Sequence, residues 1–126
     1  AIVVLIPNKA DDIGHFVVLV AKGAQSSHGH IEYFSSLGGN YQSELKKLQQ
    51  DPEIMKTLLG KNYITNTKKL QQNLYHVNDC AVWCILRCYL RTLKLREFQE
   101  LFIRKQVLEG SDDIAACLGI LLLIDI

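Results

Sequence analysis

Apolar residues gather in two short runs at the start of the chain, and each run has the length of a β-strand. Residues 1–7 (AIVVLIP) are apolar throughout, and residues 15–23 (HFVVLVAKG) are mostly β-branched or aromatic. After a polar turn, residues 30–37 (HIEYFSSL) alternate in a way that places neighbouring side chains on opposite faces of a sheet. The two faces of this third strand carry, respectively, Ile31, Tyr33 and Ser35, and Glu32, Phe34 and Ser36.

From residue 41 onwards the apolar positions follow a helical period. Pro52 is suited to the first turn of a helix and Gly60 to its end, so two short helices are expected in this part of the chain. Residues 62–70 (NYITNTKKL) are compatible with one more strand. The helices predicted from the period cover residues 41–50, 52–60, 79–93, 96–110 and 111–123.

This order of elements predicts an α+β fold, in which helices pack on a small and largely antiparallel sheet. A chain of 126 residues without repeats, linkers or low-complexity segments is expected to form one domain, residues 1–126. The strand-like start lacks the features of a signal peptide. The apolar C-terminal run, residues 114–126, is shorter than a membrane span and is most simply a core element or a surface that binds a partner.

The composition narrows the function classes only slightly. The net charge of +1 gives no support for binding to nucleic acid or to an anionic membrane. Four cysteines are too few for a disulfide scaffold, and three of them share one predicted helix. The thiols are therefore interpreted as reduced, which favours an intracellular protein.

Those three cysteines occupy positions 80, 84 and 88 of an apolar helix and allow three interpretations. Cys84 and Cys88 are most simply core residues, because free cysteine behaves as a small apolar side chain. A zinc site is disfavoured, because a set running from His76 to Cys88 on one helix spans about 18 Å and cannot converge on one ion. Cys80 alone follows a polar loop and begins the helix, where the helix dipole favours a thiolate nucleophile.

A thiolate nucleophile needs a base, and imidazole is the usual one. His15 opens a strand directly after a glycine, where it can face a cleft. His28 and His30 lie in or beside the hairpin turn and are most simply exposed to solvent. His76 lies in the loop before Cys80 and is poorly placed for a rigid hydrogen bond.

The segments GHFVVLV, IEYFSSLG and LQQNLYHVNDCAVWC resemble, in order and character, the adenovirus-type proteases (adenain) and the SUMO-specific proteases. The resemblance covers residues 3–91 and implies an α+β cysteine peptidase with its catalytic Cys at the N-terminus of a buried helix. By this resemblance His15 is the general base and Cys80 the nucleophile. Gln72 is the side-chain donor of the oxyanion hole, with Gln71 as the alternative. The resemblance implies no cofactor and no metal.

The chain departs from the family pattern in three places. The residue that orients the histidine, normally Asp, Glu or Asn, falls on Ser35, so either a weaker third member serves or Asn40 or Glu32 replaces it. Ala81 follows the nucleophile where the family normally has Gly. Family members carry an additional N-terminal segment, so the resemblance implies a minimal form or a truncated domain.

The function implied by the resemblance is cleavage of peptide or isopeptide bonds after small residues. The implied partners are a viral precursor or a ubiquitin-like conjugate as substrate, and an activating peptide of the kind some relatives need. The implied location is the host cytoplasm or nucleus, or the virion. The oligomeric state is open.

Two other functions remain open at this point. The first is acyl transfer at the same His and Cys, which would need a basic pocket for an acetyl-CoA donor; the second is a non-catalytic interaction domain that retains the fold. The basic residues that could serve such a pocket are most simply solvated: Lys46, Lys47, Lys68 and Lys69.

Overall fold

The computed structural model describes residues 1–9, 14–23, 29–71 and 77–103. The described residues form four strands: β1 (Ile2–Ile6), β2 (His15–Lys22), β3 (His30–Phe34) and β4 (Tyr63–Thr65). They also form four helices: α1 (Tyr41–Lys47), α2 (Glu53–Leu59), α3 (Val77–Tyr89) and α4 (Leu95–Ile103). The helix expected over residues 111–123 and the rest of the C-terminal run lie outside the described residues.

The strands form one sheet in the order β1-β2-β3-β4. β2 pairs antiparallel with both of its neighbours, and β4 pairs parallel with β3. The start of β2 therefore lies beside the end of β1 and the end of β3, with His15 opposite Ile6. This confirms an α+β fold with a mostly antiparallel sheet, and it confirms the fourth strand.

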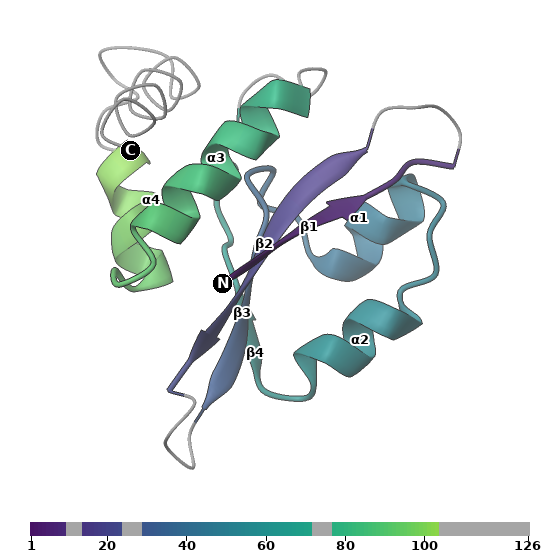
Figure 1. Ribbon diagram of the computed structural model, residues 1–126, viewed down its shortest axis with the longest axis horizontal. Coiled ribbons are helices and arrows are strands. Elements are labelled where there is room, and N and C mark those ends of the chain that lie inside the picture. The colour runs from purple at the N-terminus through teal and green to yellow at the C-terminus, as the bar shows by residue number, and fades with distance from the viewer. Residues whose placement is uncertain (10–13, 24–28, 72–76, 104–126) are drawn as a thin grey trace.

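The sheet is covered on both faces (Figure 1), with α1 and α2 on one side and α3 and α4 on the other. The alternation expected along β3 explains this arrangement, because Tyr33 belongs to the core under α1 and α2 while Phe34 belongs to the core under α3 and α4. Trp83 anchors the second core and packs against the rings of Phe98 and Phe102. Two cores on one sheet fix the positions of α1 and α3 independently.

The short helices begin and end as the sequence indicates. Asn40 caps α1, because its side chain accepts a hydrogen bond from the Ser43 N–H at 2.8 Å. α2 follows Pro52 and ends at Gly60, whose φ of 69° lies in the left-handed region that favours glycine. None of the described helices is long and apolar enough to cross a membrane.

Candidate active site

Four elements meet where β2 starts, and each contributes one polar side chain. His15 is the first residue of β2, and Ser35 directly follows β3. Glu44 projects from the first turn of α1, and Cys80 lies in the first turn of α3. α1 and α3 lie on opposite faces of the sheet, so this cluster forms at the end of the sheet where the two layers meet (Figure 1).

The imidazole of His15 contacts both Ser35 and Glu44 through one ring nitrogen. Nε2 lies 2.9 Å from the Ser35 Oγ and 3.3 Å from the Glu44 Oε2. The Ser35 hydroxyl in turn donates to the same carboxylate oxygen at 2.5 Å. All three side chains are buried, which strengthens these interactions by excluding water.

The Glu44 carboxylate also accepts a hydrogen bond from the Tyr33 hydroxyl, which donates to Oε1 at 2.7 Å. Burial raises the pKa of Tyr33, and the neighbouring Glu44 charge raises it further. Tyr33 therefore remains a hydrogen-bond donor at any physiological pH. Glu44 accepts on both of its oxygens and is fixed in one orientation.

Cys80 contacts β2 from the other side of the cluster. The backbone N–H of Phe16 donates to its Sγ at 3.4 Å, and the thiol is 1% exposed. Burial lowers the pKa of His15, but hydrogen bonds to Cys80 and Glu44 outweigh this effect and raise it from 6.5 to about 9. The structure thus brings together the two residues expected as base and nucleophile, although 65 positions separate them in the sequence.

The other helix cysteines lie away from this cluster. Cys84 is fully buried in the core under α3 and α4, and burial raises its pKa. Cys88 is partly buried against the same core, and burial raises its pKa as well. Both agree with the core interpretation. Among the described residues no group of three or more His, Cys, Asp or Glu side chains could hold a metal ion.

Of the three residues considered for orienting His15, the structure places Ser35 beside the imidazole and the other two elsewhere. Glu32 does not serve, because it points to the opposite face of the sheet and pairs with Arg87 at 2.8 Å. Asn40 does not serve either, because its side chain caps α1. The carboxylate at His15 is that of Glu44, which the sequence reasoning missed; Ser35 does contact the imidazole, as its position suggested.

A signal for Glu44 was present in the sequence. Tyr41, Glu44 and Leu45 occupy one face of α1, and all three are buried. An acidic residue on the apolar face of a short helix must find hydrogen-bond donors in the core. That rule singles out Glu44 without any structural information.

Of the other residues considered for the site, some lie among the described residues and some do not. Gln72, the expected oxyanion donor, lies outside the described residues, as do His28 and His76. Gln71 is 2% exposed, and its Oε1 accepts a hydrogen bond from the Ser36 hydroxyl at 2.7 Å. The basic side chains Lys46, Lys47, Lys68 and Lys69 are all exposed.

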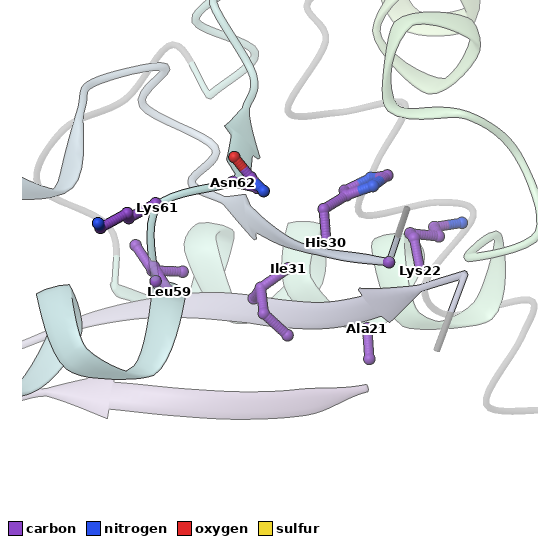
Figure 2. Close-up of a pocket in the computed structure, with 9 residues that line it drawn as sticks. Ala21, Lys22, His30, Ile31, Leu59, Lys61 and Asn62 are labelled. Carbon is purple, nitrogen blue, oxygen red and sulfur yellow. The ribbon is translucent and has the colours of Figure 1, made fainter. Parts of the chain in front are cut away.

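His30 lies far from the cluster, at the end of the β2–β3 hairpin. It lines a hollow of about 320 Å³ together with residues of β2 and of the α2–β4 connection, as Figure 2 shows. Lys22, which also lines it, donates to the backbone carbonyls of Arg91 and Leu93. His15 and Lys22 are the two ends of β2, and His30 pairs with Lys22, so His30 lies at the opposite end of the strand from His15.

No protein-family model, no curated protein and no solved structure matches the chain. The geometry described above therefore carries the functional argument.

Proposed function

We propose that the protein is a cysteine peptidase, with Cys80 as the nucleophile, His15 as the general acid and base, and Glu44 as the carboxylate that orients His15. The observation that carries the proposal is the meeting of a thiol, an imidazole and a buried carboxylate from three separate elements at one end of the sheet. A core thiol needs no imidazole beside it, and a core histidine needs no thiol.

In the proposed reaction, the His15–Cys80 pair exists as imidazolium and thiolate. The pKa of about 9 at His15 favours the imidazolium at neutral pH. The thiolate attacks the substrate carbonyl carbon and forms a C–S bond, while the carbonyl electron pair moves to oxygen. When the intermediate collapses, the C–N bond breaks and the His15 proton passes to the leaving amine.

Hydrolysis of the resulting thioester completes the cycle. Water loses a proton to neutral His15 as its oxygen attacks the thioester carbon, and the C–S bond then breaks. The products are a carboxylic acid and the regenerated imidazolium–thiolate pair. Glu44 stabilises the positive charge on His15 in each protonated state, as expected of the third member of a triad.

The proposal extends to the oxyanion hole and the substrate through the resemblance alone. Gln72 would donate its side-chain amide to the developing oxyanion, beside the backbone N–H of Cys80. The substrate would be a peptide or isopeptide bond after a small residue, in a viral precursor or a ubiquitin-like conjugate. Such a role is consistent with an intracellular or virion setting.

A non-catalytic domain is the second candidate, and the burial of the thiol is the observation that favours it. Cys80 is 1% exposed and His15 is 7% exposed. A substrate carbonyl must reach the sulfur, and a thiol with no access to solvent would remain inert whatever its partners. Access to Cys80 is therefore the property to test first.

The test is alkylation of the folded protein with iodoacetamide between pH 5 and pH 10, with mass spectrometry to locate each modified cysteine. Cys80 should react at least ~10-fold faster than Cys88 at pH 7 and retain this advantage in acid, because an imidazolium neighbour preserves the thiolate. Cys84 serves as the buried control. The variant His15→Gln should remove the advantage of Cys80 and leave Cys88 unchanged.

If Cys80 reacts as slowly as Cys84 over the whole range, the peptidase proposal is wrong and the domain is non-catalytic. If it reacts quickly, ubiquitin-like modifiers with an electrophilic C-terminus distinguish deconjugation from precursor processing. Covalent capture that requires Cys80 supports a deconjugating enzyme. Absence of capture directs the search to viral precursor peptides.

A further inference from the structure

The hydrogen bonds around the Ser35 hydroxyl determine the direction of each bond in the cluster. The Oγ of Ser35 has three partners: Glu44 at 2.5 Å, His15 at 2.9 Å and the backbone N–H of Leu37 at 3.3 Å. A serine hydroxyl offers one hydrogen and two lone pairs, so three partners use its full capacity.

Two of the three partners have fixed roles. The Leu37 N–H can only donate, so it occupies one lone pair of Oγ. A carboxylate can only accept, so the serine hydrogen points to Glu44. The second lone pair of the Ser35 Oγ therefore accepts a hydrogen bond from His15, so the Nε2 of His15 must carry a hydrogen.

We infer that Ser35 is a positioning residue of the proposed peptidase, whose hydroxyl fixes His15 as the Nε2–H tautomer, leaves Nδ1 to exchange a proton with Cys80, and joins the imidazole to the Glu44 carboxylate. The inference rests on the proposed function for its catalytic meaning. In this arrangement Ser35 and Glu44 act together as one third member, divided between the end of β3 and helix α1. The direct contact from Nε2 to Glu44 is 3.3 Å, longer than an ordinary charge-assisted hydrogen bond, which is why the hydroxyl is needed.

Tyr33 completes the arrangement, because its hydroxyl holds the other oxygen of Glu44 at 2.7 Å. The titratable groups that face His15 in the described part of the chain are thus Cys80 from α3 and Glu44 from α1, with Tyr33 of β3 behind Glu44. Because Ser35 and Glu44 share one role, a carboxylate at position 35 should substitute functionally for the carboxylate at position 44.

The test follows His15 directly by NMR on the full chain with 15N-labelled histidine, the His15 signals being assigned with His15→Gln. Above its titration midpoint, the wild-type imidazole should give the Nε2–H pattern in two-bond 1H–15N correlations. Ser35→Ala should yield both tautomers and lower the titration midpoint by about one unit. In the double variant Ser35→Asp with Glu44→Gln, the titration midpoint of His15 should be higher than in Glu44→Gln alone and closer to the wild-type value.

Cys80 alkylation at pH 7 gives the second readout and should fall by up to about tenfold in Ser35→Ala, because a one-unit loss of basicity at His15 lowers the ratio of imidazolium–thiolate to imidazole–thiol tenfold. Ser35→Thr, which retains the hydroxyl, should keep the wild-type tautomer and midpoint. The inference is overturned if Ser35→Ala leaves both the tautomer and the midpoint of His15 unchanged, or if the double variant titrates no higher than Glu44→Gln. If His15 responds as stated while Cys80 remains inert in every protein, the peptidase proposal fails and the role of Ser35 stands.

Discussion

In the part of the chain that the structure describes, two glutamates are buried on opposite faces of the sheet, and their partners differ. Glu32 is fully buried and receives two hydrogen bonds from Arg87, at 2.8 and 2.9 Å. Glu44 is 6% exposed and receives its hydrogen bonds from Tyr33 and Ser35, with the imidazole of His15 at 3.3 Å. One carboxylate faces a permanent cation and the other faces a cation that can lose its proton.

This difference separates a structural ion pair from the proposed catalytic site. A guanidinium keeps its proton at every accessible pH, and Arg87 is further fixed by the carbonyls of Leu90 and Leu93 and by the ring of Phe98. An imidazole, unlike a guanidinium, can lose its proton, at His15 with a pKa of about 9, and His15 has a thiol beside it. Burial and charge are common to both pairs; only the second can pass a proton to a reacting group.

The largest expected effect on stability is that of Glu32→Gln. This change leaves the Arg87 charge buried without its counter-ion, which should cost about 3–5 kcal/mol in the free energy of unfolding. Glu44→Gln should cost less, since His15 can become neutral, the Ser35 hydroxyl can still donate to the amide oxygen, and the Tyr33 hydroxyl can accept from the amide NH2. Urea unfolding of both variants measures the contrast.

The repair of the Arg87 pair provides a control. The double variant Glu32→Gln with Arg87→Met removes both charges, and it should recover most of the stability that Glu32→Gln loses. If Glu44→Gln proves as destabilising as Glu32→Gln, the two carboxylates contribute equally to stability. The contrast between a structural ion pair at Glu32 and a catalytic role at Glu44 is then wrong.

For the reactivity of Cys80, Glu44→Gln should have the larger effect and Glu32→Gln the smaller, the reverse of their effects on stability. Glu44→Gln removes the charge that stabilises the imidazolium, so the rate of Cys80 alkylation at pH 7 should fall by about 10–100-fold. Glu32→Gln should leave that rate within about twofold wherever the protein is folded, because Glu32 contacts Arg87, two turns further along α3 than Cys80, and not His15. Circular dichroism under the assay conditions confirms folding, and equal losses in the two variants would contradict the assignment of Glu44.

Much of the fold could be predicted because each element has a local cause. The alternation in HIEYFSSL assigns Tyr33 and Phe34 to opposite cores, and both assignments are confirmed. Pro52 and Gly60 bracket α2 as their backbone preferences require. The sequence does not predict that helices cover both faces of the sheet, because periodicity identifies the apolar face of each helix but not the face of the sheet that it contacts.

The site could be predicted only in part, for a related reason. His15 and Cys80 stand out by residue type and by their places at the starts of elements. The resemblance to the peptidase families implies the orienting residue at position 35, with Glu32 or Asn40 as alternatives. Glu44 reaches His15 from a helix nine residues later, and the turn geometry between β3 and α1 decides that meeting. Glu32 cannot reach His15, because Arg87 donates to both of its carboxylate oxygens on the other face of the sheet.

The stability of the protein should depend on pH through His15. Its pKa is raised from 6.5 to about 9, so the folded state binds this proton more tightly than the unfolded chain. The resulting stabilisation is fully present below pH 6.5 and is lost as the pH rises through about 9, with an upper limit of about 3 kcal/mol. The difference in unfolding free energy between wild type and His15→Gln, measured at pH 6 and pH 9.5, isolates this contribution.

Two outcomes of this measurement are informative. A difference that shrinks from pH 6 to pH 9.5 agrees with the raised pKa of His15. A difference that is constant, or that grows with pH, means that His15 is neutral in the folded protein. In that case His15 and Cys80 do not form an imidazolium–thiolate pair.

The smallest effect is expected at a third glutamate, which gives the baseline for the other two. Glu100 pairs with Arg96 one turn away on α4 at 3.2 Å, and the two side chains are 48% and 88% exposed. Because water and salt screen such a pair, Glu100→Gln should change the free energy of unfolding by less than about 0.5 kcal/mol. The same substitution at positions 32, 44 and 100 thus compares one chemical change in three environments: beside a buried guanidinium, beside a buried imidazole, and in solvent. Urea unfolding at low and high salt measures all three, and a loss at Glu100 equal to that at Glu44 would mean that burial adds nothing to the His15–Glu44 contact.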